Sequence, residues 1–288
     1  MLKLISTPAP AKINLFLRVT GRRADSYHEL DSLLVPITLC DRVAIAIRPA
    51  TLPSISLRCD TPGLGPDDQN LAVRAARAFM AEFAIAADAR IDLRKAIPAG
   101  AGLGGGSSDA GAILRMMAQL YDIDDRDRLA SIAVKLGADV PFFLDPAPAR
   151  VRGIGELIEQ LDHFTPLEIV IAVPPVTVPT AEVFKHLPRA AWSGPASSAA
   201  VDAITSGRID PDHLINDLAG VAKARWPVIA ELKTTLAQTG AIAAAMSGSG
   251  GAVFGIFASA RDTAPAAEEI RARHPAAHVF AVSTLTNL

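Results

Sequence analysis

The first third of the chain consists of short apolar runs separated by turn-forming residues. Runs rich in Ile, Leu and Val, ended by Gly, Pro, Asp or Ser, predict strands over residues 11–20, 33–39, 41–48 and 55–59. Residues 70–83 then change to helical spacing, with Leu71 and Phe79 on one side. The segment 90–95 alternates charged and apolar residues, which predicts a half-exposed strand.

Helices and strands alternate along the rest of the chain. Helical spacing of apolar residues predicts helices over residues 110–120, 125–136, 227–238 and 264–273, and apolar runs predict strands over residues 167–173, 253–257 and 277–283. Pro and Ala alternate over residues 145–149, which indicates a connection between domains, and the small residues of 190–200 predict a mobile loop. This order predicts an α+β protein with domains of residues 1–148 and 149–288.

A glycine-rich run from Pro98 to Asp109 leads directly into the helix predicted at 110–120. Its glycines let the backbone approach a ligand closely, and Ser107 and Ser108 can cap the helix. Backbone N–H groups and the positive end of a helix dipole together favour an anion, so the run predicts a phosphate cradle. A flexible Gly/Ser linker would explain the composition, but not the apolar helix face that follows at once.

Two familiar phosphate loops fit this run poorly. A Walker A loop needs a lysine at its end, and the first lysine after these glycines is Lys135. Gly100, Gly102 and Gly105 do satisfy the dinucleotide pattern G-x-G-x-x-G, with Asp122 near the distance of its acidic residue. However, the strand before the run alternates, whereas a central parallel strand is continuously apolar. A dinucleotide-dependent oxidoreductase is therefore disfavoured.

The composition of the chain limits the kinds of binding partner and the compartment that we expect for the protein. The 288 residues are 50% hydrophobic, with 28 Lys and Arg against 30 Asp and Glu, so no basic excess indicates nucleic-acid binding. No signal peptide and no apolar run of membrane-spanning length is visible, so we expect a cytoplasmic protein without a membrane partner. Cys40 and Cys59 form no metal or disulfide pattern and are expected to be reduced thiols.

Three further motifs contain residues that are candidates for catalysis or ligand binding. Lys12 and Asn14 lie on one face of the first predicted strand. Asp139 follows the end of a predicted helix by a few residues, in an apolar setting. A second glycine cluster, residues 246–251, precedes an apolar strand and could simply be the turn of a hairpin.

In this order the motifs resemble those of the GHMP kinase superfamily, and residues 21–28 and 70–76 extend the match. The resemblance implies a two-domain fold, with an N-terminal ribosomal-protein-S5-domain-2-like ATP-binding domain, a C-terminal ferredoxin-like substrate domain and the active site in the cleft between them. It also implies transfer of the ATP γ-phosphoryl group to the tertiary hydroxyl of a small molecule that carries a cytidine diphosphate group. Such a reaction belongs to the non-mevalonate route to isoprenoid precursors.

The resemblance assigns roles to individual residues. Asp139 is implied as the catalytic base and Lys12 as the cation that pairs with it, while Ser107 or Ser108 could reach a Mg²⁺ ion. The implied ATP-binding residues are Pro98, Ala99, Gly100, Ala101, Gly102, Leu103, Gly104, Gly105, Gly106, Ser107, Ser108, Asn70 and Leu71. The implied substrate-binding residues are Tyr27 and Phe184, which would sandwich the cytosine, His28, which would hydrogen-bond to it, and Asn14, Thr180, Gly248 and Ser249.

Several alternatives stay open at this point. Asp139 could be a turn residue, Lys12 a solvated strand lysine, Phe184 a core residue and Asn70 the N-cap of its helix. Another small-molecule kinase of the superfamily, acting on mevalonate or homoserine, and a non-catalytic nucleotide-binding regulator are the competing functions. The protein is expected to be a monomer or a homodimer.

Overall fold

The computed structural model describes residues 2–61 and 67–286, which fold as two compact units. One unit comprises Met1–Ala11, Leu39–Ile97 and Gly104–Pro146, and the other comprises Lys12–Thr38, Pro98–Leu103 and Ala147–Leu288. The sequence places a single break at residue 148, whereas the units interleave along the chain. They do so because strands β1 (Lys3–Arg22) and β2 (His28–Pro49) are 20 and 22 residues long, and each contributes to both units.

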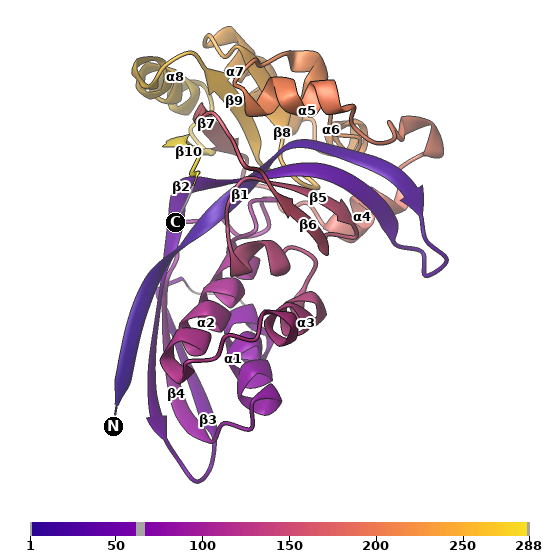
Figure 1. Cartoon of the computed structure of the whole chain (residues 1–288). Coiled ribbons are helices and arrows are strands. Elements are labelled where there is room, and N and C mark those ends of the chain that lie inside the picture. The colour runs from indigo at the N-terminus through magenta and orange to yellow at the C-terminus, as the bar shows by residue number, and fades with distance from the viewer. Residues whose placement is uncertain (1, 62–66, 287–288) are drawn as a thin grey trace. The chain divides into compact units, whose positions relative to one another are not determined.

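The first unit is a sheet with helices on one face (Figure 1). Strand β4 (Ala87–Arg94) lies between β2, to which it is antiparallel, and β3 (Ser54–Cys59), to which it is parallel, and β1 pairs with β2. The helices are α1 (Leu71–Glu82), α2 (Gly105–Tyr121) and α3 (Arg126–Leu136). Side chains along β4 alternate between buried and more exposed positions, as its sequence predicts, and the buried ones face the core under α1 and α2.

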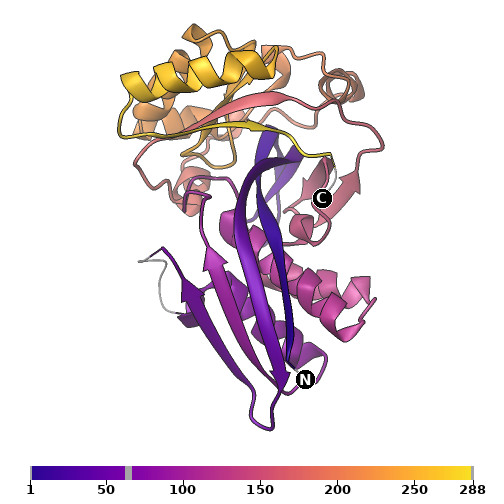
Figure 2. The ribbon, with the colours of Figure 1, turned by 90° about the vertical axis from the view of Figure 1, so that its left-hand side faces the viewer.

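The second unit contains a four-stranded antiparallel sheet (Figure 2). Its strands are β7 (Glu168–Val173), β8 (Ala243–Met246), β9 (Val253–Phe257) and β10 (His278–Ser283), in the order β10-β7-β9-β8. Helix α7 (Val228–Gln238) precedes β8, and α8 (Ala260–Arg273) connects β9 to β10. A β-α-β-β-α-β succession with this strand order is ferredoxin-like, so the predicted α+β class and C-terminal architecture are confirmed.

The remaining elements of the second unit are short, and the sequence did not predict them. They are β5 (Ala149–Gly153), β6 (Leu157–Gln160), α4 (Thr180–Lys185), α5 (Ser198–Thr205) and α6 (Ala219–Arg225), with single 3-10 turns at Arg189–Ala191 and Pro211–His213; a further two lie at Asp67–Gln69 and Pro141–Leu144 of the first unit. Strand β5 pairs with β2, where Arg150 makes two hydrogen bonds of 2.8 Å to the carboxylate of Asp31. Within the described part of the chain, no helix combines the length and apolar character needed to cross a bilayer.

Two further sequence-based expectations differ from the structure. The segments 33–39 and 41–48 form one strand, because the carboxylate of Asp41 is buried against Lys95 instead of ending the strand in solvent. The segment 190–200, expected to be a mobile loop, is held by hydrogen bonds: Gly194 N donates to Val19 O at 3.2 Å, and Ala196 N donates to Asp31 at 2.7 Å.

Candidate active site

The glycine-rich run enters α2 at Gly105, five residues earlier than the sequence predicts. Gly104 is the N-cap in a left-handed conformation (φ 74°), which Ser107 and Ser108 cannot be because they lie inside the first turn. The predicted capping by these serines is therefore wrong. Ser108 is fully buried, and within the described residues its Oγ has no hydrogen-bond partner.

The earlier part of the run packs backbone to backbone against the second glycine cluster. Ala252 N donates to Ala101 O at 2.9 Å, and Ser247 Oγ donates to Gly102 O at 3.3 Å. A Cβ atom at Gly102 would lie 2.7 Å from Ser247 O, and one at Gly248 would lie 2.9 Å from Gly102 O. Residues 247–252 do connect the β8–β9 hairpin, so the turn interpretation is confirmed, but this turn also supports the other glycine loop.

Lys12 and Asn14 occupy buried positions on β1, with 3% and 5% of their surface exposed. The alternative of a solvated lysine is therefore wrong. Lys12 Nζ donates to Asn14 Oδ1 at 2.8 Å, and Asn14 Nδ2 donates to Ser32 Oγ at 2.8 Å. Lys12 N also donates to Leu103 O of the glycine run at 2.9 Å. One strand thus presents an ammonium group of fixed orientation beside that run.

Asp139 lies in the first unit, just after α3. Gly137 ends the helix by donating its N–H to Ala133 O at 3.2 Å, and its backbone is extended (φ 169°). Val140 N then donates to Gly137 O at 3.1 Å, which closes a tight turn with Asp139 inside it. Asp139 is half-buried. The turn fixes the backbone of Asp139 just after the end of the helix.

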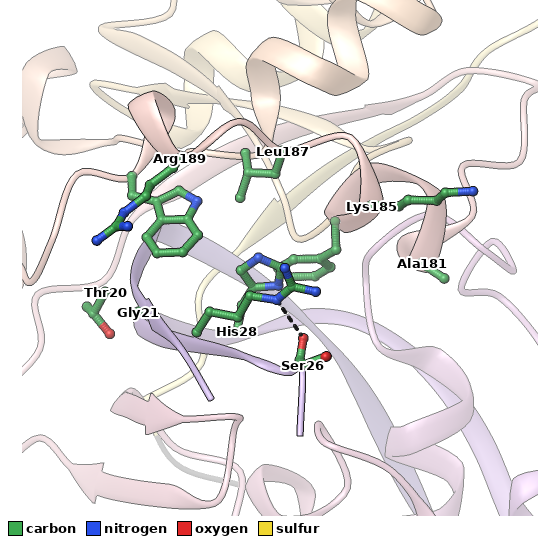
Figure 3. Close-up of a pocket in the computed structure, with 11 residues that line it drawn as sticks. Thr20, Gly21, Ser26, His28, Ala181, Lys185, Leu187 and Arg189 are labelled. Atoms are coloured by element: carbon green, nitrogen blue, oxygen red, sulfur yellow. Dashed lines mark hydrogen bonds between the residues drawn. The ribbon is translucent and has the colours of Figure 1, made fainter. Parts of the chain in front are cut away.

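A pocket of about 780 Å³ lies in the second unit (Figure 3). His28 and Phe184, both predicted for substrate binding, form its aromatic wall, with ring centroids 5.1 Å apart and planes 27° from parallel. Trp192 meets the His28 ring edge-on at 5.6 Å. Phe184 contributes to the core and to this wall, whereas the preceding Val183 is fully buried. Tyr27, on the adjoining β1–β2 turn, is 62% exposed.

Cationic side chains also line this pocket. Arg22, Lys185 and Arg189 are among its lining residues, together with the aromatic wall. Burial and, to a lesser extent, the Arg22 charge lower the pKa of His28, so its imidazole is neutral at pH 7 and can both donate and accept a hydrogen bond. A flat ring linked to an anionic group matches this lining.

The sequence analysis assigned no role to Trp192 or to the three cationic residues of this pocket, Arg22, Lys185 and Arg189. Trp192 falls in the segment that was expected to be a mobile loop, and Lys185 and Arg189 fall in and after the unpredicted helix α4. An aromatic residue within a stretch of small residues was the one signal that could have indicated Trp192.

The structure also shows the contacts of two other pairs of predicted site residues. Thr180 Oγ1 and Ser249 Oγ are 2.7 Å apart, which joins α4 to the second glycine cluster and brings two predicted substrate residues together. Asn70 Oδ1 accepts from Ala72 N at 2.9 Å, so the N-cap interpretation is confirmed. Leu71 reaches the glycine run, because a Cβ atom at Gly106 would lie 3.5 Å from its Cδ1.

Comparisons with known proteins identify the family to which the chain belongs. Residues 70–145 match the family model for the GHMP kinases N terminal domain, and residues 209–277 match that for the GHMP kinases C terminal domain. The chain belongs to the GHMP kinase family, which confirms the family resemblance found in the sequence.

Within this family, the chain is similar to proteins named 4-diphosphocytidyl-2-C-methyl-D-erythritol kinase. It is 42% identical to that of Anaeromyxobacter dehalogenans (strain 2CP-C) over 258 residues, covering 87% of this chain and 80% of the relative. It is 38% identical to that of Citrifermentans bemidjiense over 283 residues, covering 96% and 95%. A crystal structure of 4-(cytidine 5'-diphospho)-2C-methyl-D-erythritol kinase superposes with a TM-score of 0.83 at 35% identity, covering 97% of this chain and 99% of that one.

Proposed function

We propose that this protein transfers the γ-phosphoryl group of ATP to the 2-hydroxyl of 4-diphosphocytidyl-2-C-methyl-D-erythritol, giving the 2-phosphate and ADP. The observation that carries the proposal is the pocket lined by the His28–Phe184 stack and by three cationic side chains. A cytidine diphosphate group has a flat ring for the aromatic side chains and a negatively charged diphosphate for the cations. The names of the relatives at 42% and 38% identity support the same substrate. Mevalonate and homoserine contain no nucleobase, so neither of them would have a ring to stack on this aromatic wall.

Phosphoryl transfer requires positioning, cationic charge and a proton acceptor. In the proposed mechanism, Asp139 accepts the hydroxyl proton as the hydroxyl oxygen attacks the γ-phosphorus. Lys12 stabilises the negative charge on the transferring group, and its hydrogen bond to Asn14 fixes the direction of the ammonium group. The glycine run and the N-terminus of α2 hold the ATP phosphates through backbone N–H groups.

A magnesium ion is expected to accompany the nucleotide. In the described residues no three His, Cys, Asp or Glu side chains come together as a metal site, which suits an ion held mainly by phosphate oxygens and water. The Ser108 hydroxyl, buried and without a hydrogen-bond partner in the described chain, is an oxygen ligand of the kind that Mg²⁺ prefers, and Ser107 is the neighbouring candidate. When bound, the ion would neutralise phosphate charge.

The pocket provides distinct contacts for the two parts of the substrate. Phe184 offers a ring face for cytosine, Tyr27 lies on the adjoining turn as the second stacking partner, and neutral His28 reads the polar edge of the base. Arg22 and Arg189 can pair with the diphosphate. Thr180 and Ser249, which contact each other, supply hydroxyl groups for the rest of the substrate.

An ADP-release assay with purified protein tests the proposed function. ATP is supplied with one of three acceptors: the diphosphocytidyl alcohol, mevalonate or homoserine. We expect turnover with the diphosphocytidyl alcohol alone. Turnover only with mevalonate or homoserine would contradict the proposed substrate, and ATP binding without turnover on any acceptor would favour the non-catalytic regulator.

The roles of Asp139 and Lys12 are tested in the same assay. Asp139→Asn should lower kcat by about 10²–10⁴-fold, since a general base contributes about that much. Lys12→Ala should lower kcat while ATP still binds. The matched control is Asp127→Asn, because Asp127 is an exposed aspartate in the first turn of α3. A kcat for Asp139→Asn equal to that of this control would remove Asp139 from the mechanism.

A further inference from the structure

Trp192 contacts two pocket residues that the proposed mechanism assigns to different parts of the substrate. Its ring is perpendicular to that of His28, with the planes at 86° and the centroids 5.6 Å apart, while His28 itself stacks on Phe184. The guanidinium carbon of Arg189 lies over the Trp192 ring, 5.8 Å from its centroid. One indole therefore contacts both the imidazole proposed to read the base and a cation proposed to pair with the diphosphate.

A single 3-10 turn brings Arg189 and Trp192 together. The turn spans Arg189–Ala191, and Trp192 N donates to Arg189 O at 3.2 Å, so the two side chains project from the two ends of one turn. Arg189 is exposed, whereas Trp192 is half-buried. An aromatic face that attracts the guanidinium limits the positions of this long side chain, which lowers the entropic cost of pairing it with an anion.

The indole of Trp192 has no polar anchor of its own. Among the described residues, its buried Nε1 has no hydrogen-bond partner. The ring packs against the hydrophobic core of the second unit, which includes Val183 and Leu187. The orientation of the ring therefore depends on apolar packing and on the backbone that carries it.

A buried carboxylate fixes that backbone. Asp217, 7% exposed, accepts from Ser193 N at 2.9 Å and also from the Ser193 hydroxyl. The same carboxylate accepts from Val19 N of β1 at 2.7 Å, and Gly194 N donates to Val19 O at 3.2 Å. Hydrogen bonds to an ionised group are stronger than those between neutral groups. The residue that follows Trp192 is thus held by a strong anchor on β1.

A second buried carboxylate holds the far end of the same segment. Asp31 accepts from Ala196 N at 2.7 Å, and Arg150, which pairs with Asp31, donates to Ala196 O at 3.1 Å. Burial alone would raise the pKa of Asp31, but the hydrogen bonds from Arg150 and Ala196 and the charge of Arg150 hold this pKa below its ordinary value. Residues 193–196 are therefore fixed at both ends, and Asp217 is the anchor beside Trp192.

We propose that Trp192 is a positioning residue for both the base and the diphosphate of the substrate, and that Asp217 holds Trp192 in place. This inference rests on the proposed function, because it takes the ligand of the pocket to be a nucleoside diphosphate. Trp192 fixes the plane of His28 for the base and keeps Arg189 near the diphosphate. Loss of Trp192 weakens the contacts to both parts, whereas loss of Phe184 weakens the contact to the base alone.

The binding of cytidine and of CDP separates the two contributions. Dissociation constants are measured by ligand-detected NMR, with ADP and Mg²⁺ saturating the nucleotide site. Trp192→Ala should weaken cytidine binding about two- to tenfold, as loss of an aromatic pair does, and CDP binding by a further two- to fivefold through Arg189. Phe184→Ala should weaken the binding of both ligands by the same factor, and Arg189→Ala should weaken that of CDP alone.

The chain offers a matched control for Trp192. Trp226 is its other tryptophan, the guanidinium carbon of Arg225 lies 5.7 Å from the Trp226 ring centroid, and Trp226 lies outside the lining of the pocket. Trp226→Ala should bind both ligands as the wild type does. A wild-type ratio of CDP to cytidine affinity in Trp192→Ala would overturn the inference and leave the kinase proposal intact. Failure of the wild type to bind either ligand would instead contradict the proposed substrate.

The role of Asp217 is tested through the fluorescence of Trp192 in a Trp226→Phe background, where Trp192 is the only tryptophan. Asp217→Ala leaves three donors on Val19 and Ser193 without their acceptor, so the ligand-free emission should shift to longer wavelength and the ratio of CDP to cytidine affinity should fall. Asp217→Asn should restore both, because its amide oxygen can accept from the two N–H groups and its NH₂ can donate to the Ser193 hydroxyl.

Unchanged emission and an unchanged affinity ratio in Asp217→Ala would overturn the positioning by Asp217. Circular dichroism reports whether this variant folds. If it does not, Ser193→Ala, which removes one of the three hydrogen bonds, replaces it and should give smaller changes in the same directions. An emission and an affinity ratio of Ser193→Ala equal to those of the wild type would then overturn the role of this anchor.

Discussion

Replacing Gly102 by alanine tests whether the two glycine loops support each other through their backbones. Gly102 has φ +78°, and its added Cβ would lie 2.7 Å from Ser247 O and 3.1 Å from Gly250 O. The left-handed conformation costs a non-glycine residue about 1–2 kcal/mol. Displacing two backbone carbonyls adds about 1–3 kcal/mol, as overpacking does in a closely packed interior. We expect Gly102→Ala to lower the free energy of unfolding by roughly 3 kcal/mol.

Gly240→Ala is the matched control. Gly240 has φ +94°, so it pays a comparable conformational cost, but no atom lies within 4 Å of its added Cβ. Urea unfolding of the two variants therefore separates backbone conformation from the contact with the second loop. Gly102→Ala should also raise the KM for ATP, whereas Gly240→Ala should not. Equal losses of stability in the two variants, with unchanged KM for ATP, would refute the proposed loop-to-loop support.

Three other substitutions follow from single contacts. Asn70→Ala should cost about 1 kcal/mol of stability through loss of the N-cap, whereas Asn70→Asp should retain most of it in thermal unfolding. Phe184→Ala should raise the KM for the cytidine substrate roughly tenfold, since an aromatic pair contributes about 0.5–1.5 kcal/mol beyond the buried area, and should leave the KM for ATP unchanged in steady-state kinetics. Arg150→Ala should destabilise the protein by about 3–5 kcal/mol in urea, because it leaves the buried carboxylate of Asp31 unpaired.

The regular parts of the fold could be predicted from the sequence because their packing follows local patterns. The alternation in 90–95 and the helical spacing in 70–83 both match the observed burial. Asp41 shows where this logic fails. A charged residue between two apolar runs indicates a break, but Lys95, 54 positions away, pairs with it and lets the strand continue. No local window contains that information.

The candidate site was predictable to a similar extent. The glycine run before a helix indicated a phosphate cradle by itself, whereas the roles of Lys12 and Asp139 were implied only by the family resemblance. The mutual packing of the two glycine loops arises from a contact between residues about 145 positions apart, so the sequence could indicate two flexible turns but not their partnership. Trp192 was missed for a related reason: hydrogen bonds to β1 and β2 hold its segment in place, and composition alone suggested a mobile loop.

Analysis of the reaction product tests the central claim most directly. The purified protein is incubated with ATP, Mg²⁺ and 4-diphosphocytidyl-2-C-methyl-D-erythritol, and the product is examined by mass spectrometry and phosphorus NMR. The account predicts a gain of one phosphoryl group, a new phosphomonoester resonance coupled to no proton of a CH–O or CH₂–O group, and an intact cytidine diphosphate. A product phosphorylated on a primary or secondary hydroxyl, or ADP formation without a phosphorylated alcohol, would contradict it.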